Sequence, residues 1–365
     1  MWHSYFAKMN EIWPAQTSVS SDSHFTLQAK VAFLSRPQAY SPAPANVIVR
    51  ETHMSWVFLA GNRVYKLKKP VRFPYLDFST IERRERTCSA ELGLNRRLAR
   101  DVYLDVIPLV AAEFGLAIGG RGIPIDWLVC MRRLDERSMM DRLLLEGRLR
   151  LGHIERLSDV LASFYSTAPP ALSASEGHIA ELRRTMAYNK RILLDGRFKL
   201  PAGLVRRIDR CQHLFLDRYR SAAAARFRRR RIVDGHGDLR PEHIYINDDI
   251  RIIDCLEFNV RLRIVDPFDE VAYLALECER LGAAWAGGAL RERMKHKLRD
   301  GPVDALFDFY TCYRATLRAR LAIAHLYEER PRTPQKWPRL AMDYLQLAFS
   351  SARRLESSFR TRSYR

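Results

Sequence analysis

The stretch His236-Gly237-Asp238-Leu239-Arg240-Pro241-Glu242-His243, followed by Arg251-Ile252-Ile253-Asp254, is the most informative part of the chain. Each half places an aspartate beside a short apolar run that is typical of a β-strand. Between the halves, Asn247-Asp248-Asp249 predicts a turn, so the apolar runs on either side of it can form a hairpin. Such a hairpin would bring Asp238 and Asp254 to one end.

Two carboxylates placed in this way fit phosphoryl transfer, which asks little covalent chemistry of the protein. Asp238 would orient an attacking hydroxyl and accept its proton. Asp254 would hold magnesium, a hard cation that prefers oxygen ligands. Either aspartate alone would be interpreted as a surface turn residue. The joint pattern, with its spacing and flanking strands, favours the enzymatic interpretation.

A strand-rich part comes first in the chain. Trp56–Ala60 and Arg63–Leu67 flank a Gly-Asn turn and predict a β-hairpin. Ser79 and Glu82 have the spacing of a capping box, which predicts a helix that ends near Ala99. Further strands are expected at Val102–Val110, Gly115–Ile118 and Ile125–Met131.

Helical spacing of apolar residues dominates the chain after Met131. The order predicts an α+β, two-lobe fold, with a sheet-rich N-lobe at residues 24–131 and a mainly helical C-lobe at residues 132–365 that carries both aspartate loops. The polar, serine-rich residues 1–23 are expected to be a disordered tail. Helices are expected at Leu27–Leu34, Met139–Leu151, Ile154–Thr167, Ile179–Leu194 and Leu204–Tyr219, and from Phe268 to the end.

The composition is that of an ordinary globular protein. Hydrophobic residues make up 47% and charged residues 28% of the 365, a length typical of two domains or lobes. The six cysteines include no Cys-x-x-Cys pair, so neither a zinc site nor a disulfide framework is indicated, and a reduced, cytoplasmic setting is favoured. The N-terminus lacks the apolar core of a signal peptide and no apolar stretch is long enough to span a membrane, so we expect no membrane partner.

The chain is strongly basic, with a formal net charge of +19, and its densest basic run is Arg226–Arg231. A solvated face and a site for an anionic partner are both open interpretations of this run. No zinc-finger, helix-turn-helix or RNA-binding signature accompanies it. Nucleic-acid binding is therefore a secondary hypothesis.

The two aspartate segments carry a resemblance to a known family. His236–His243 is similar to the His-Gly-Asp-x-x-x-x-Asn loop of the aminoglycoside phosphotransferase family, which shares a protein-kinase-like fold with the choline kinases. Ile253-Asp254 and Glu257, with Asp266-Pro267 downstream, resemble the family's Ile-Asp-x-Glu and Gly-Asp-Pro segments. The match covers about residues 47–281, in the family's order.

The resemblance implies roles for residues of the N-lobe. Lys66 resembles the strand lysine that binds phosphate, and Glu91 resembles its helical glutamate partner. The backbone at Met131, Arg132 and Arg133 resembles the hinge that holds adenine. The resemblance thus implies ATP and Mg²⁺ as cofactors.

Neighbouring residues compete for two of these roles. Lys68 and Lys69 are alternatives to Lys66, and the period of two along a strand puts Lys66 and Lys68 on one face. Glu82 and Glu85 are likewise alternatives to Glu91.

His243 departs from the family pattern, because it stands where the family usually has a metal-binding asparagine. Imidazole is a poorer partner for magnesium than a carbonyl oxygen. His243 is kept as a candidate metal ligand together with Asp254, and a structural role for it is equally open. The second metal site could also shift to Glu257 or Glu242.

The sequence predicts an ATP-dependent phosphotransferase that moves the terminal phosphoryl group to a hydroxyl of a small molecule. The alternative is a catalytically weak, kinase-like module that binds nucleotide as a regulatory signal. Nothing in the helical part identifies the acceptor, and the sequence gives no indication of the oligomeric state.

Overall fold

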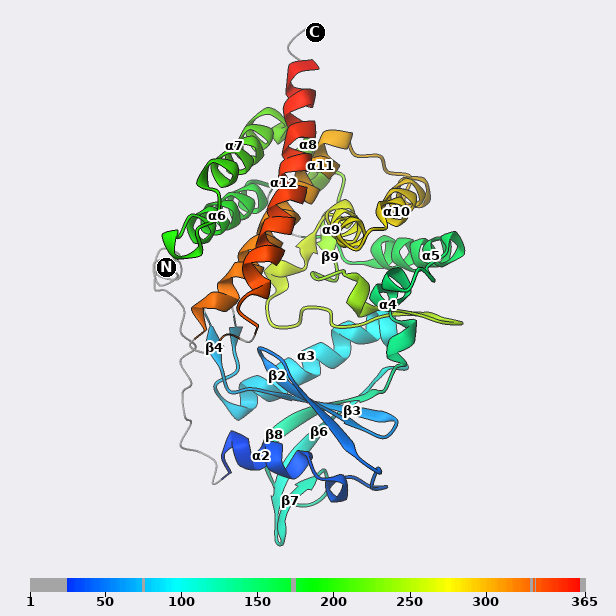
Figure 1. Cartoon of the computed structure of the whole chain (residues 1–365). Coiled ribbons are helices and arrows are strands. Elements are labelled where there is room, and N and C mark those ends of the chain that lie inside the picture. The colour runs from blue at the N-terminus through cyan, green and yellow to red at the C-terminus, as the bar shows by residue number, and fades with distance from the viewer. Residues whose placement is uncertain (1–24, 74–75, 172–174, 329–330, 332, 362–365) are drawn as a thin grey trace. The chain divides into compact units, whose positions relative to one another are not determined.

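The computed structural model describes residues 25–73, 76–171, 175–328, 331 and 333–361 (Figure 1). It forms two compact units. The first comprises the residues up to Ser138 together with Arg251–Val260, and the second comprises Met139–Ile250 and Arg261–Arg365. The tail expected at residues 1–23 lies outside the described residues.

The first unit is built on a six-stranded antiparallel sheet, which contains the five strands expected from the sequence and one more, β1. In spatial order the strands are β1 (Val47–Glu51), β2 (Ser55–Ala60), β3 (Arg63–Lys68), β8 (Ile123–Arg132), β6 (Tyr103–Ala112) and β7 (Gly115–Ile118).

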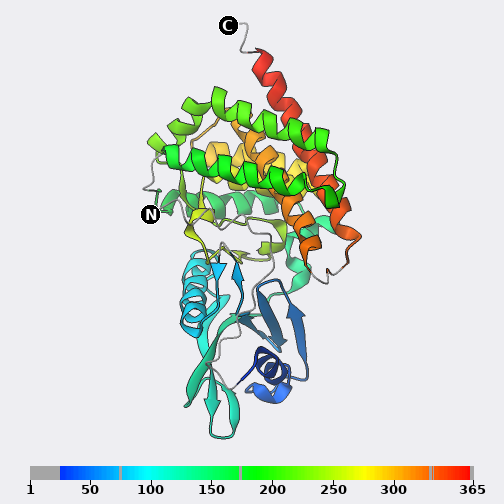
Figure 2. The same ribbon diagram turned by 90° about the vertical axis from the view of Figure 1, so that its left-hand side faces the viewer.

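Helices α2 (Leu27–Leu34) and α3 (Ile81–Ala99) cover opposite faces of this sheet (Figures 1 and 2). Leu128 belongs to the buried cluster that includes Leu34 of α2, whereas the next residue, Val129, belongs to the cluster that includes Cys88 of α3. This alternation is the period of two that a strand imposes on its side chains.

The start of α3 lies close to the predicted place, but its cap is a different residue. Thr80 is the N-cap, and its Oγ1 accepts a hydrogen bond of 3.3 Å from the backbone N–H of Arg83. Ser79 instead donates its hydroxyl to Asp77 at 2.5 Å, within the turn after the short β4–β5 hairpin (Arg72–Phe73 and Leu76–Asp77). The helix cap expected at Ser79 is therefore one residue later, at Thr80.

The second unit is mainly helical, and in it α12 lies along the largely buried α11 (Figures 1 and 2). Its helices are α4 (Met140–Leu145), α5 (Leu151–Thr167), α6 (Ser175–Leu193), α7 (Ala202–Arg218), α8 (Arg220–Arg228), α9 (Pro267–Arg280), α10 (Ala284–Lys297), α11 (Asp304–Ala324) and α12 (Lys336–Thr361).

Short strand pairs carry the aspartate loops. β10 (Ile244–Ile246) and β11 (Ile250–Ile252) form the predicted hairpin, and β9 (Val233–Asp234) pairs with β12 (Ile264–Val265).

Two parts of the helical prediction were wrong. The single helix expected at Met139–Leu151 is broken into α4 and the start of α5, with Gly147 between them at φ +63°. A left-handed residue cannot continue a right-handed helix, and glycine adopts this conformation without steric cost. The helix α8, which contains Arg226, was not predicted.

The segment Arg251–Val260 also differs from its expected place. We assigned it to the C-lobe by its position in the chain, but it packs within the first unit. Among the described residues, no helix is both long and apolar enough to cross a membrane.

A buried ion triad ties α2, α3 and β8 together in the first unit. Asp126 accepts hydrogen bonds from Lys30 at 2.9 Å and from Arg84 at 2.7 and 3.1 Å. All three side chains are at most 5% exposed. Removing the acid would leave two buried cations without their counter-charge.

We therefore expect Asp126→Asn to lower the free energy of unfolding by about 3–5 kcal/mol, the usual cost of breaking a buried ion pair. The matched control is Glu113→Gln, which changes an exposed acid in the β6–β7 turn of the same unit. Urea unfolding of both variants measures the difference. Equal effects of the two substitutions would contradict the role of the triad.

Candidate functional site

In the first unit, Lys66 joins a strand, a helix and a loop. Its Nζ lies 2.9 Å from Glu91 Oε1 on α3 and 2.9 Å from Asp254 Oδ1 in the segment after β11. The sequence prediction had placed Lys66 with Glu91 and had named Asp254 separately. The structure brings all three together.

Burial alone would lower the pKa of the Lys66 amine, but the carboxylates of Asp254, Glu91 and Glu257 outweigh it and raise that pKa well above its usual value. Burial likewise favours a raised pKa for Glu91, yet the two lysines Lys66 and Lys68 hold that pKa below its usual value. Lys66 and Glu91 are therefore both charged at neutral pH.

Two of the competing residues, Lys69 and Glu82, lie outside the group formed by Lys66, Glu91 and Asp254. Lys69 pairs with Glu51 at 2.6 Å, and Glu82 is exposed in the first turn of α3. Lys68 is different, because it shares Glu91 with Lys66 and also binds Glu257.

Asp254 has an unusual backbone conformation, with φ +62°, in the left-handed region that few residues other than glycine adopt. Its backbone N–H donates to the hydroxyl of Tyr103 at 3.1 Å. Its side chain is 47% exposed, in contrast to the fully buried Glu91. Asp254 is thus the carboxylate of this group that a cation from solvent can reach.

The residues expected to hold adenine lie at the end of β8. The backbone N–H of Arg132 donates to Val102 O at 2.8 Å, and that of Arg133 donates to Asn62 O at 2.9 Å. Hydrogen bonds from these two groups to a base would therefore replace bonds within the protein. The assignment of Met131, Arg132 and Arg133 to adenine stays a prediction.

In the second unit, the loop that carries Asp238 is held by a buried acid, Glu270, in the first turn of α9. Glu270 accepts hydrogen bonds from the backbone N–H groups of His236 and Gly237, and from the Tyr165 hydroxyl at 2.7 Å. His236 itself accepts from the backbone N–H of Asp238 at 3.2 Å through Nδ1. His236 thus contributes a hydrogen bond within its own loop.

The Asp238 carboxylate accepts hydrogen bonds from an arginine and a tyrosine. Oδ2 accepts from Arg240 at 2.8 Å, and Oδ1 accepts from the Tyr273 hydroxyl at 3.1 Å. Burial favours a raised pKa for this carboxyl, but the guanidinium charges of Arg240 and Arg318 outweigh burial and hold the pKa well below its usual value. Asp238 is therefore a stable carboxylate near neutral pH.

His243 is engaged on both sides of its ring. Nδ1 lies 2.9 Å from the backbone oxygen of Asp238, and Nε2 lies 3.2 Å from Arg240 Nη2. Because a carbonyl oxygen can only accept, Nδ1 donates to it and Nε2 is left to accept from Arg240. This geometry favours the structural alternative for His243 over metal ligation.

Several residues of this neighbourhood were missed in the sequence. Arg240 lay within the quoted motif without a role, and Tyr273 and Glu270 follow Asp266-Pro267 on α9. Arg318 on α11 binds Glu277 at 3.0 Å. For the three helical residues the signal was their spacing on amphipathic helices, which gives no partner across the fold.

Two other arginines of this unit make ion pairs within the protein. Arg314 pairs with Asp269 through two hydrogen bonds, at 2.7 and 2.6 Å. Arg226, the first residue of the basic run, is buried and binds Asp266 and Asp300, each at 2.6 Å. This residue is therefore unavailable to an external anion.

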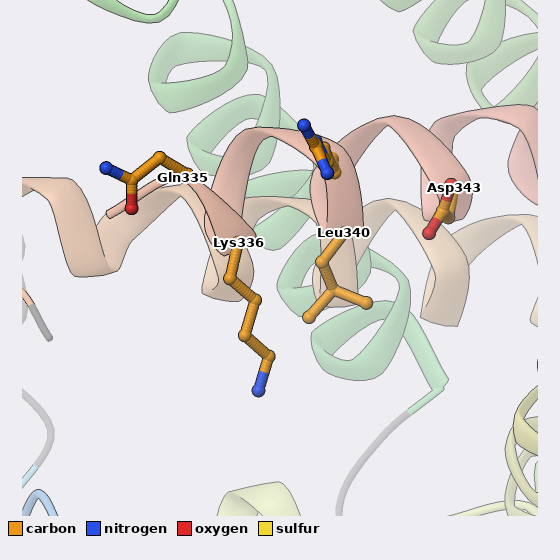
Figure 3. A pocket seen from close by; sticks show the side chains of 5 residues that line it. Gln335, Lys336, Leu340 and Asp343 are labelled. Atoms are coloured by element: carbon orange, nitrogen blue, oxygen red, sulfur yellow. The ribbon is translucent and has the colours of Figure 1, made fainter. Parts of the chain in front are cut away.

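A shallow cavity of about 430 Å³ lies at the start of α12 in the second unit (Figure 3). It is lined by Gln335, Lys336, Arg339, Leu340 and Asp343. None of the candidate residues of either unit lines it. We therefore assign it no part in the proposed chemistry.

Gly235 leaves room for the acid that holds the Asp238 loop. A Cβ at this position would lie 2.6 Å from Val265 Cγ2 and 2.7 Å from Glu270 Oε2. We expect Gly235→Ala to destabilise the protein by about 1–3 kcal/mol, as overpacking usually does. The control is Gly288→Ala in α10, where nothing lies within 4 Å and the change should stabilise by up to about 1 kcal/mol. Urea unfolding of both variants distinguishes a local clash from a general intolerance of alanine.

The lowered pKa of Asp238 predicts a pH dependence of stability. A carboxyl whose pKa is lower in the folded state stabilises the fold when the pH is above its unfolded-state pKa, near 3.8. This stabilisation is lost as the pH falls from there towards the lower pKa of the folded state. The stability difference between the wild type and Asp238→Asn should therefore be constant from about pH 5 to 7 and shrink below about pH 4.

The measurement is chemical denaturation across this pH range. Asp217→Asn serves as the control, because Asp217 lies in the same unit and its side chain is 62% exposed. A wild-type advantage that grew as the pH fell would contradict the depressed pKa.

Known proteins resemble this chain in sequence over much of its length. No protein-family model matches it. Uncharacterized proteins of Mycobacterium bovis and Mycobacterium tuberculosis are 33% identical to it over 286 residues, which cover 78% of this chain and 56% of each relative. The chain thus spans about half the length of the curated relatives it matches.

Solved structures of small-molecule kinases share its fold. A choline/ethanolamine kinase family protein from Mesorhizobium loti has a TM-score of 0.52 at 14% identity, covering 89% of this chain and 94% of that one. Choline kinase from Cryptosporidium parvum has 0.52 at 9% identity, covering 92% and 96%. A thermostable mutant of aminoglycoside phosphotransferase APH(4)-Ia has 0.50 at 13% identity, covering 87% and 96%. The chain therefore has the two-lobe, protein-kinase-like fold of choline kinases and aminoglycoside phosphotransferases, which confirms the fold that the sequence predicted.

Proposed function

We propose that this chain is an ATP- and magnesium-dependent phosphotransferase that moves the terminal phosphoryl group to a hydroxyl of a small molecule. The observation that carries the proposal is the bridge made by Lys66 between Glu91 and Asp254. A phosphate-binding lysine fixed by a helical glutamate, next to a metal-binding aspartate, is the arrangement that phosphoryl transfer needs.

The donor set fits magnesium. Among the described residues, no group of three His, Cys, Asp or Glu side chains could hold a metal ion by itself. Magnesium is usually bound by one or two carboxylates, with water and the substrate phosphates as its other ligands. The half-exposed carboxylate of Asp254 meets this requirement, so the bound nucleotide would supply the remaining oxygen ligands as well as the phosphoryl group.

The chain's own residues would then have distinct tasks. Asp254 would hold the cation, and Lys66 would bind phosphate oxygens while Glu91 keeps its amine in place. Asp238, kept ionised by its neighbours, would orient the acceptor hydroxyl and take its proton. Glu270 would keep the Asp238 loop in position.

The alternative, a catalytically weak nucleotide-binding module, is favoured by one specific observation. Arg240 already neutralises Asp238 at 2.8 Å and also contacts His243. A carboxylate bound to a guanidinium is a weaker base than a solvated one, because the positive charge favours its ionised form. This pairing would slow proton transfer unless Arg240 moves.

Two experiments test the proposal. Calorimetry with ATP and GTP, each with and without Mg²⁺, should show magnesium-dependent binding that is weakened in Asp254→Ala. A screen of hydroxyl acceptors, followed by ADP release, should then find turnover that falls about 10²–10⁴-fold in Asp238→Asn, the usual contribution of a general base. Nucleotide affinity should be retained in that variant, since Asp238 is assigned to the acceptor.

The outcomes separate the candidate functions. Binding without turnover for any acceptor would favour the regulatory module. Binding of neither nucleotide would overturn both nucleotide-dependent functions and leave the nucleic-acid hypothesis, which rests on the net charge of +19, as the better lead. That lead predicts nucleic-acid binding that weakens steeply with salt.

A further inference from the structure

Lys68 is a second lysine of the same strand, two residues beyond Lys66, and it is buried. Its side chain is 1% exposed, and its Nζ lies 2.6 Å from Glu91 Oε2 and 2.6 Å from Glu257 Oε1. Leu67, between the two lysines, packs in the cluster on the other face of the sheet. The period of two along β3 therefore points both lysines at Glu91.

Glu257 lies three residues after Asp254, in a segment that has no regular secondary structure. Other contacts hold this segment to the first unit: the Asp254 N–H donates to Tyr103 at 3.1 Å, and the Cys255 N–H donates to the Asn95 side chain at 2.9 Å. The Lys68–Glu257 pair fixes the segment on the far side of Asp254. Backbone and side-chain contacts thus surround the residue that has the left-handed conformation.

The two acids of this segment differ in their access to solvent. The Glu257 side chain is 9% exposed and its Oε1 is bound to Lys68, whereas the Asp254 side chain is 47% exposed. A buried charge that loses its partner is costly, so Glu257 depends on Lys68 as its counter-ion, whereas Lys68 also pairs with Glu91. A metal that took Glu257 as a ligand would leave Lys68 with only the carboxylate that it shares with Lys66.

We propose that Lys68 is a positioning residue for the phosphate- and metal-binding residues, and that Glu257 is its counter-ion instead of a metal ligand. Lys68 keeps Glu91 oriented towards Lys66, and through Glu257 it holds the segment that presents Asp254. The effect expected on ATP affinity rests on the proposed function. The fixing of residues 251–260 by the Lys68–Glu257 pair does not rest on it.

The test compares full-length Lys68→Met, Glu257→Gln and the double variant with the wild type. Lys69→Met is the matched control, because Lys69 is adjacent on the chain and binds Glu51 outside this network. The first readout is amide hydrogen exchange of residues 251–260 in the free protein. We expect faster exchange at Asp254 and Cys255 in each single variant, no further increase in the double variant, and no change in the control.

The second readout is ATP affinity as a function of Mg²⁺ concentration. Each single variant should weaken ATP binding about 10-fold, the lower end of the loss when a contact that orients a metal ligand is removed. The double variant should be no weaker than either single one. Lys68→Arg, which keeps the charge, should retain most of the affinity.

The opposite pattern would overturn the proposal. In that pattern, Glu257→Gln needs a higher Mg²⁺ concentration to bind ATP while its amide exchange is unchanged. Lys68→Met then behaves as the wild type in both readouts. If a single variant does not fold, the double variant decides, since replacing both ions by neutral groups is tolerated where removing one is not. A folded double variant supports the pair and an unfolded one contradicts it.

Failure of the proposed function gives a different result. A wild-type protein that binds neither ATP nor GTP would remove the nucleotide role, but the exchange data on residues 251–260 would still show whether Lys68 and Glu257 hold the segment.

Discussion

The first unit depends on the paired ion bridges from the carboxylate of Glu91 to Lys66 and Lys68. This carboxylate is fully buried, and its two oxygens accept from Lys66 and Lys68. A buried carboxylate without partners would be strongly destabilising, so the two lysines must both point at it. The lysines in turn bind Asp254 and Glu257, and so connect Glu91 to the segment Arg251–Val260, which comes much later in the chain but belongs to the first unit.

The second unit uses a buried acid in a similar way. Glu270, at the start of α9, accepts the backbone N–H groups of the loop that leads to Asp238, and Gly235 leaves the space that this carboxylate needs. In both units a helical glutamate fixes a neighbouring element that carries a candidate site residue. In both, the candidate aspartate pairs with a cationic neighbour, Lys66 for Asp254 and Arg240 for Asp238.

The basic composition has a partly internal explanation. Arg226 begins the densest basic run, yet it is buried against Asp266 and Asp300, and Arg314 is buried against Asp269. A run of arginines along the sequence is therefore not equivalent to a basic patch on the surface. Arginine suits such internal pairs because its planar guanidinium can make two hydrogen bonds to one carboxylate.

The sequence by itself determined the strands of the N-terminal sheet, most of the helices and the identity of Lys66, Glu91, Asp238 and Asp254 as candidates, because periodicity and motif spacing are local properties. It did not determine the place of Arg251–Val260, the roles of Lys68 and Arg240, or the engagement of His243. Those depend on partners that are distant in the chain, such as Glu257, which lies 189 residues from Lys68. Local sequence sets the direction in which a side chain leaves its strand or helix. Only the packed structure decides which charged partner that side chain contacts, because a buried charge requires a partner of opposite charge.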